Sequence, residues 1–419
     1  MRRATVALSL LALFAGGVPV LASPPGLERY VVVLRDGVSA SRVSARHERA
    51  YGLTLHHVYG SAIRGYSATI PSTRVAEVRE DPQVAYLSPD LAVRAAPKGR
   101  GSTDALPLGV DRINAEERGN TGLGVNVAVL DTGIDVDHPD LVDNIAGGKN
   151  CSSGPSFDDG NGHGTDVAGT IAAGRNGFGV FGVAPDAGLW AVRVLNNGGL
   201  GSTSSVVCGI DFVDSLSPAK GGPISVANMS LSGFGADDGQ CGTVNGDAEH
   251  QAICAAVSDG VTFVAAAGNS GGNIASEVPA AYDEVLTVSA LADSTGSPCG
   301  GGVTTNYGPD DTFASFSNFA GPADAGHIIG APGVNIRSTT KNGRYGFKSG
   351  TSMASPHVAG AAALYLQGHP GAGPSEVMNS LLAVAEPPDV SFGGECATGF
   401  SHTDPSELHP EPVVRADAL

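Results

Sequence analysis

Three residues far apart in the chain have side chains that could act together in nucleophilic catalysis. Asp131 follows an apolar Val-Ala-Val-Leu run, His163 lies in a Gly-His-Gly-Thr segment, and Ser352 lies in a Gly-Thr-Ser-Met segment. A serine hydroxyl is a weak nucleophile at neutral pH, so it needs a base such as imidazole, and a carboxylate can hold that imidazole in one tautomer. Each residue alone is more often structural. The three together, each in a glycine-rich junction, indicate an acid, a base and a nucleophile.

The elements that must position these residues alternate between strands and helices from residue 123 onward. Apolar segments predict strands over 125–130, 189–195, 224–231, 261–267 and 285–291, and periodicity predicts helices from His163, over 204–215 and 248–259, and from Ser352 to about Gln367. This alternation predicts an α/β fold, a mostly parallel sheet with helices on both faces. Ligands bind beyond the carboxyl ends of strands in such sheets, and Asp131 stands at such an end.

A smaller unit precedes this region. Its predicted order is strand, helix, two strands, helix and strand, which is typical of a ferredoxin-like α+β domain; the elements fall at 30–34, 41–51, within 53–70, at 72–80 and at 84–87. Residues 95–106 have no apolar periodicity and are predicted to form a linker, where proteolytic processing is favoured.

Four segments resemble the signature blocks of subtilisin-type serine peptidases. They are Val-Leu-Asp131-Thr-Gly-Ile-Asp, Gly-His163-Gly-Thr, Ala-Ala-Gly-Asn269-Ser and Ser-Gly-Thr-Ser352-Met-Ala-Ser-Pro-His. The triad members also follow the subtilisin order. The resemblance covers roughly residues 106–385, and residues 28–94 resemble the inhibitory propeptide of the family.

This resemblance implies a catalytic role for Asn269. Its side-chain amide and the backbone N–H of Ser352 would stabilise the oxyanion that forms when Ser352 attacks a peptide carbonyl. Ser355 and His357 are not expected to take part, and His357 is expected to be a packing residue.

The resemblance also implies a substrate-binding surface. Residues Ser230, Leu231, Ser232 and Gly233 would pair with the substrate backbone as an added strand, and Ala266, Ala267 and Gly268 would form another wall. Spacing puts Glu277 near the pocket floor, where it would favour a basic residue before the cut, although a solvated loop charge is the favoured interpretation. Asp166 stands where many subtilisins have histidine, and its negative charge would favour the imidazolium form of His163.

No cofactor is expected for catalysis, but the resemblance implies a structural calcium site. Asp140 and Asn176 match its side-chain ligands, and the carbonyls of Gly174, Phe178 and Val180 would complete an oxygen cage. The alternative is an ordinary glycine-rich loop, because Arg175 adds an unfavourable positive charge.

The six cysteines all lie after residue 150, at positions 151, 208, 241, 254, 299 and 396. An even number in an exported protein favours disulfides, but six cysteines allow 15 pairings. Cys241 and Cys254 are the favoured local bridge. A buried free thiol is the alternative for Cys208, which lies in an apolar helical segment.

The N-terminus predicts export. Arg2 and Arg3 precede a short apolar run and small residues ending at Ala22, as in a secretory signal peptide, and the run is short for a membrane anchor. We therefore expect a signal peptide over 1–22, a propeptide inhibitor domain over 23–95, a processing linker over 96–106, a catalytic domain over 107–386 and an acidic tail over 387–419. The tail is predicted to be mobile except where Cys396 anchors it.

Charge separates the two main parts. The chain has 24 Lys and Arg against 42 Asp and Glu, and this excess of acid disfavours nucleic-acid binding. Residues 1–100 carry 13 basic and 7 acidic side chains, a net +6, and the remainder carries 11 and 35, a net −24. Opposite charges favour association of the propeptide with the catalytic domain.

These observations together predict a secreted serine endopeptidase made as a self-processed precursor. Its partners would be protein and peptide substrates and its own propeptide as inhibitor, with no membrane association after signal removal, and a monomer is expected. The alternatives are a narrow-specificity processing peptidase and an inactive relative that acts as a binding protein.

Overall fold

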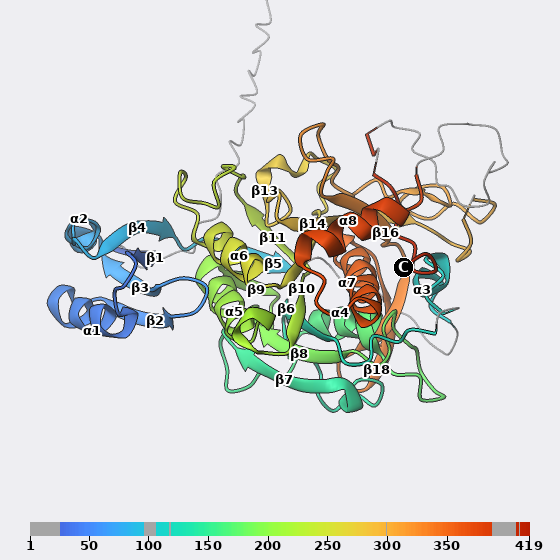
Figure 1. The fold of residues 1–419 in the computed structure, drawn as a ribbon, viewed down its shortest axis with the longest axis horizontal. Helices are drawn as coiled ribbons and strands as arrows, with labels where there is room; N and C mark the ends of the chain where they lie inside the picture. The colour runs from blue at the N-terminus through green and yellow to red at the C-terminus, as the bar shows by residue number, and fades with distance from the viewer. Residues whose placement is uncertain (1–25, 96–105, 117–118, 299, 388–407, 410) are drawn as a thin grey trace, which may run out of the picture.

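The computed structural model describes residues 26–95, 106–116, 119–298, 300–387, 408–409 and 411–419 (Figure 1). The predicted signal peptide, most of the predicted linker, Cys299 and Cys396 lie outside these residues. None of the helices in the described part of the chain is both long and apolar enough to cross a membrane.

A small α+β domain stands at one side of the molecule (blue in Figure 1). Its four strands pair in the order β2-β3-β1-β4, all antiparallel, which is the predicted ferredoxin-like arrangement. Alternation along β1 buries both of its faces: Val32 packs under the domain's own helices, while Val31 and Val33 join the apolar core of the larger domain. The elements are β1 (Leu27–Leu34), α1 (Ala40–Tyr51), β2 (Thr54–Tyr59), β3 (Gly65–Pro71), α2 (Val75–Arg79) and β4 (Val84–Pro89).

The larger domain is built on a central eight-stranded sheet. Its order is β15-β14-β12-β10-β6-β8-β7, with β16 also paired to β14, and every pair is parallel except β14 with β15. The strands are β6 (Asn126–Asp131), β7 (Ile145–Asn150), β8 (Gly188–Arg193), β10 (Ile224–Met229), β12 (Thr262–Ala266), β14 (Val285–Ala292), β15 (Thr312–Phe313) and β16 (Ile328–Pro332).

Helices cover both faces of this sheet, as predicted. In β6, Val127 and Val129 join one apolar core with α4 and α7, while Ala128 and Leu130 join the other with α5 and α6. Side chains that alternate between two buried faces explain why the central strands have long apolar runs, such as Val-Ala-Val-Leu in β6. The helices are α3 (Leu108–Arg112), α4 (His163–Ala172), α5 (Thr203–Ser215), α6 (Ala248–Ser258), α7 (Thr351–Gly368) and α8 (Pro374–Val384).

A strand that the sequence analysis did not predict connects the two domains. β5 (Ala92–Ala95) follows β4 at the end of the small domain and pairs antiparallel with both β9 (Leu200–Ser202) and β11 (Leu231–Phe234), and β11 pairs in turn with β13 (Glu277–Val278). The end of the small domain is therefore a central strand in a sheet of the large one. A separate hairpin consists of β17 (Ile336–Thr340) and β18 (Arg344–Lys348).

Two disulfides lie in the described part of the larger domain. Cys241 is bonded to Cys254, the predicted local pair, and Cys151 is bonded to Cys208. Cys208 is therefore not a free thiol. Sequence offered no basis for this second pair because its partners are 57 residues apart.

The predicted mobility of the C-terminal tail is wrong for residues 411–419. Val413, Val414 and Ala416 are fully buried, and the backbone of Val413 bridges Gly330 and Glu386. These apolar side chains fill space against the sheet, so the segment packs as part of the large domain despite its acidic neighbours.

Candidate active site

The first two predicted site residues meet where β6 ends and α4 begins. His163 Nδ1 lies 2.8 and 2.9 Å from the two carboxylate oxygens of Asp131, and both side chains are buried. A carboxylate only accepts hydrogen bonds, so Nδ1 carries the proton and Nε2 has the lone pair. Nε2 has no hydrogen-bond partner among the described residues. The imidazole is thus held in the tautomer that a general base needs.

Glycine at position 164 permits this close approach. A Cβ atom there would lie 2.2 Å from the carbonyl oxygen of Gly133 and 3.0 Å from Asp131 Cβ. The N–H of Gly164 instead donates to Thr132 Oγ1 at 2.9 Å. The glycine of the Gly-His-Gly-Thr segment therefore lets the start of α4 pack directly against the end of β6, where a larger residue would clash.

Asp159, which the sequence analysis missed, holds the first turn of α4. Its carboxylate accepts hydrogen bonds from the backbone N–H groups of Asn161, Gly162 and Thr165, at 2.7, 2.8 and 3.0 Å, and from the hydroxyl of Thr132 at 2.9 Å. N–H groups at a helix start have no partner within the helix, so this carboxylate stabilises the turn that carries His163. An aspartate four residues before a helical histidine was the available signal.

Ser352 is the second residue of α7 and is buried. Its hydroxyl donates to the carbonyl oxygen of Ser230 at 3.3 Å, and Ser230 Oγ donates back to the Ser352 carbonyl at 2.9 Å. The hydrogen bond between Ser352 and His163 that proton transfer requires is not formed in this structure. The hydroxyl must turn from Ser230 to His163 Nε2, a change that often accompanies substrate binding.

Asn269 adjoins the start of α7 with a fixed amide. Its Oδ1 accepts hydrogen bonds from the N–H and the hydroxyl of Thr351, at 2.8 and 3.2 Å. The Nδ2 group is therefore left as a donor, next to the backbone N–H of Ser352 in the first turn of the helix. The two donors predicted for an oxyanion lie beside the same helix start.

Asn318 holds the loop that carries Asn269, and the sequence analysis missed it. Its Oδ1 accepts from the N–H groups of Ser270 and Gly272, both at 3.0 Å, and its Nδ2 donates to the carbonyl of Ala267 at 2.9 Å. Gly268 has φ +100°, and a Cβ there would lie 2.4 Å from Asn318 Nδ2. No periodic pattern marks such a long-range amide contact.

The residues proposed to bind substrate lie along two adjoining segments. Leu231 and Ser232 pair with Ala95 and Arg94 of β5, and Gly233 pairs with β13. The remaining predicted residues, Ser230, Ala266, Ala267 and Gly268, are buried at the ends of β10 and β12. An extended segment of this chain thus lies where the sequence predicts a substrate backbone.

Glu277 and His357 can now be placed. Glu277 begins β13 and is half-buried. Its carboxyl carbon would lie 3.5 Å from a Cβ atom placed on Gly268, so Glu277 is not a fully solvated loop charge.

His357 is fully buried in α7 and donates through Nδ1 to the Met353 carbonyl at 2.9 Å. Burial lowers the pKa of His357 to about 4, so it is a neutral packing residue. Ser355, the other residue set aside, donates to Asn228 at 2.7 Å.

The predicted calcium ligands converge, but in an arrangement that does not fit a cation as it stands. Asp140 accepts hydrogen bonds on one oxygen from Asn176 Nδ2 at 3.0 Å and on the other from the N–H of Val180 at 3.0 Å. The Asn176 oxygen accepts from the N–H of Phe178, and Gly174 donates its N–H to the Asp140 carbonyl. N–H donors therefore face the Asp140 carboxylate, the only carboxylate among the predicted ligands. A bound Ca²⁺ would require oxygen atoms from Asn176 and Val180 in place of these donors.

A buried ion pair lies beside the start of α4. Asp166 is fully buried, and Lys348 Nζ lies 3.2 Å from its carboxylate and 2.5 Å from the carbonyl oxygen of Gly162. Burial raises the pKa of Asp166 to about 6, although the charges of Lys348 and His163 oppose that rise. Above this pH an anion lies one helical turn from the base.

The buried Asp–His pair, a serine at a helix start and a neighbouring amide donor, all beyond the carboxyl ends of parallel strands, define the site of a serine peptidase. Residues 122–401 match the Subtilase family, and residues 29–96 match Peptidase inhibitor I9. The chain belongs to the subtilase family. It is a serine endopeptidase with an inhibitor-type propeptide domain.

Similar proteins agree with this assignment. The chain is 42% identical over 310 residues to an alkaline protease of Alkalihalobacillus alcalophilus, spanning 73% of this chain and 70% of the relative. It is 37% identical over 331 residues to subtilisin E of Bacillus subtilis (strain 168), spanning 77% and 76%. A crystal structure of a cold-adapted subtilisin-like serine proteinase matches with a TM-score of 0.54 and 32% identity, over 74% of this chain and 99% of that chain.

We predict that replacing Asn269 with alanine lowers kcat by about 10²–10³-fold with little change in KM, because an oxyanion donor acts mainly in the transition state. The measurement is steady-state hydrolysis of a chromogenic peptide by the processed enzyme. An unchanged thermal midpoint shows that the fold is intact. A loss below about threefold would exclude Asn269 as an oxyanion donor.

We predict that Asp166→Asn moves the acid limb of the kcat/KM profile to lower pH by about 0.5–1 unit, because the anion that favours the His163 imidazolium is removed. The matched control is Asp143→Asn, an exposed carboxylate in the same domain, which should leave the limb in place. An acid limb that stays or moves to higher pH in Asp166→Asn contradicts an electrostatic action on the base.

Proposed function

We propose that this protein is exported as a precursor in which Ser352 cuts the chain near Ala95 or Ala96, and that the freed enzyme then cleaves extended segments of other proteins. The observation that carries the proposal is β5, an extended segment of this chain paired on both sides in the sheet of β9 and β11. It ends at Ala95, beside residues assigned to substrate binding.

The proposed chemistry assigns one step to each side chain. Ser352 Oγ forms a bond to the carbonyl carbon while its proton passes to His163 Nε2, and Asp131 stabilises the resulting imidazolium. Asn269 Nδ2 and the Ser352 N–H hold the oxyanion. His163 then gives its proton to the leaving amine, so that the C–N bond breaks and an acyl-enzyme remains. Water, activated by the same imidazole, releases the acid product.

Contacts between the two domains support an inhibitory role for the propeptide. Asp211 on α5 accepts hydrogen bonds from the N–H groups of Ser61 and Ala62, at 2.7 and 2.9 Å. In the opposite direction, Asp90 accepts from the N–H and the hydroxyl of Ser204 at the start of α5, both at 2.8 Å. These contacts hold the propeptide to α5 at two places, the loop at Ser61 and Ala62 and the segment that leads into β5.

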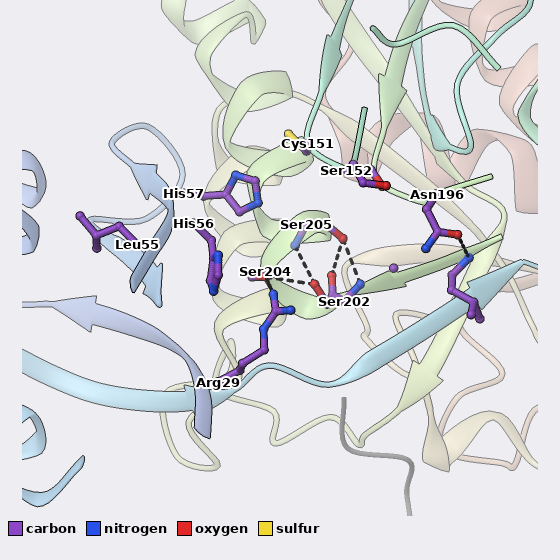
Figure 2. Close-up of a pocket in the computed structure, with 13 residues that line it drawn as sticks. Arg29, Leu55, His56, His57, Cys151, Ser152, Asn196, Ser202, Ser204 and Ser205 are labelled. Carbon is purple, nitrogen blue, oxygen red and sulfur yellow. Dashed lines mark hydrogen bonds between the residues drawn. The ribbon is translucent and has the colours of Figure 1, made fainter. Parts of the chain in front are cut away.

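An open pocket also lies at the boundary between the domains (Figure 2). Arg29, His56 and His57 of the propeptide line one side, and residues that include Ser202 and Ser204 at the start of α5 line the other. No triad residue lines it. This pocket therefore depends on the propeptide remaining in place and is separate from the site of peptide cleavage.

Recognition through the backbone favours cleavage of many sequences. β5 is held by strand pairing on both edges, and strand pairing does not depend on side-chain identity. Narrow specificity is the second candidate, because Glu277 adjoins Gly268 and would favour a basic residue before the cut. Cleavage of a peptide library by wild type and Glu277→Gln separates the two, since only the narrow enzyme loses a basic preference.

Export and a monomeric state complete the proposal. Two disulfides fit an oxidising compartment, and the signal-like segment 1–22 precedes the described residues. A monomer is proposed because one chain contains every group that the mechanism uses.

We predict that wild-type precursor separates into two fragments, cut near residue 95 or 96, and that Ser352→Ala precursor stays full length. Only the wild type should be labelled by a serine-reactive phosphonate. Intact-mass spectrometry identifies the cut, and Ser355→Ala, a buried serine in the same helix, is the control that still self-cleaves. A folded wild type that stays full length and unlabelled would refute the proposed mechanism.

Calcium binding at the Asp140 loop stays a prediction. If an ion binds after the Asn176 amide turns its oxygen inward, millimolar Ca²⁺ should raise the thermal midpoint of the Ser352→Ala precursor and a chelator should lower it. Asp140→Asn should abolish both effects. Identical midpoints with Ca²⁺ and with chelator would show that the loop is stabilised by its hydrogen bonds alone.

A further inference from the structure

A pocket of about 160 Å³ lies beside the strand that the proposed function assigns to substrate pairing. The large domain lines it with residues that include Phe234 at the end of β11, Val278 of β13 and Glu249, the second residue of α6. The propeptide closes another side with residues that include Pro89 and Leu91. That side is lost when the propeptide leaves, so the pocket then opens to an incoming substrate.

Glu249 brings an unpartnered carboxyl group to this pocket. The residue is 2% exposed, and its Oε1 has no hydrogen-bond partner among the described residues. Burial raises the pKa of Glu249 to about 8, and the charge of Asp247 adds to the rise. Buried polar atoms in proteins are nearly always hydrogen-bonded. A buried acid oxygen without a partner, in the lining of a pocket, therefore indicates a partner that arrives from outside.

Asp247 is the other charged residue in the lining, and its oxygens are already used. Oδ1 accepts hydrogen bonds from the N–H groups of Glu249 and His250, at 3.0 and 3.3 Å, and Oδ2 accepts from the Tyr282 hydroxyl at 2.6 Å. His250 itself bonds to Glu284 at 2.9 Å and does not line the pocket. The lining thus holds two acids and no base, and Glu249 has the acceptor that a ligand could use.

The path of the propeptide shows how a substrate would reach this pocket. Leu91 donates its N–H to Thr203 Oγ1 at 3.2 Å and accepts from the Thr203 N–H at 2.8 Å, and β5 follows directly. Counting back from a cut after Ala95 or Ala96, Leu91 is the fifth or sixth residue. Gly233, also in the lining, lies one residue beyond the part of β11 that pairs with β5. A substrate bound in this way passes the pocket with its third to sixth residues before the cut.

We propose that Glu249 selects substrates that carry a lysine or arginine side chain in this stretch, between the third and the sixth residue before the cut. The inference rests on the proposed function, because it takes substrates to enter as β5 does. The cationic group donates to the Glu249 carboxylate, and the methylene groups of the same side chain lie along Phe234 and Val278. An apolar side chain fills the same space but leaves the carboxyl group without a partner.

This selection is distinct from the one assigned to Glu277. Glu277 adjoins Gly268 and would act on the residue just before the cut, whereas Glu249 lies on α6 and acts several residues upstream. Substrates that keep the residue just before the cut constant therefore report on Glu249 alone.

The test uses the processed wild-type enzyme and peptides of one sequence with alanine just before the cut. Arginine, lysine or methionine is placed at one position at a time, from the third to the sixth residue before the cut. At pH 9, kcat/KM should be at least about tenfold higher with arginine or lysine than with methionine at one of these positions, because only a cation pairs with the carboxylate. Mass spectrometry of the products shows that the cut stays at the same bond.

Glu249→Gln keeps the shape of the side chain and loses its charge. It should reduce the basic preference to below about threefold and leave the methionine peptides within about threefold of their wild-type kcat/KM. The matched control is Glu376→Gln on α8, an exposed glutamate in the same domain, which should keep the wild-type preference.

The proposal is overturned if methionine serves as well as the basic residues at all four positions, or if Glu249→Gln retains the preference with an unchanged thermal midpoint. In either case the enzyme still cleaves peptides, so the proposed function stands. A folded wild type that cleaves none of the peptides refutes the proposed function and this inference with it.

Discussion

The carboxylate of Asp159 holds the start of α4 against the end of β6, and the geometry of the site depends on that contact. It takes N–H groups of Asn161, Gly162 and Thr165 that the helix itself cannot satisfy. Lys348 binds the carbonyl of Gly162 from the other side. The backbone around His163 is therefore held through both its N–H groups and a carbonyl. The turn that carries the imidazole is fixed in the position where the ring contacts Asp131.

Hydrogen bonds from backbone N–H groups to carboxylates also join the propeptide to the enzyme, and they do not follow from the net charges of the two parts. The first hundred residues are net basic and the rest net acidic, yet several of the contacts between them are hydrogen bonds from backbone N–H groups to carboxylates. Asp90 of the basic part contacts the start of α5, and Asp211 of the acidic part receives the loop at Ser61 and Ala62. Net charge favours encounter between the parts, whereas these local contacts fix their orientation.

Sequence predicted the features that depend on local pattern. Strands such as β6 are apolar because both of their faces are buried. The glycines beside His163 indicated that the backbone of α4 packs closely against another segment, which is the end of β6. Features that depend on distant partners were missed or wrong. β5 is four residues long and forms only where β9 and β11 pair with it. Asn318 contacts a loop that is 46 to 51 residues away in the chain, and Val413 is buried although its neighbours in sequence are acidic. At the Asp140 loop the sequence gives the residue types, whereas the atom that the Asn176 amide presents to Asp140 depends on the folded loop.

The two-sided pairing of β5 also bears on which proteins such a groove can attack. A substrate segment that pairs along both edges must first lose the backbone hydrogen bonds it makes within its own protein, over several residues. A folded substrate therefore has to open locally, and the rate of its digestion follows the population of that open state when opening and closing are fast. Substrate binding in the manner of β5 would therefore select by local stability, so that compact, tightly bonded proteins are cleaved slowly and loosely folded ones quickly.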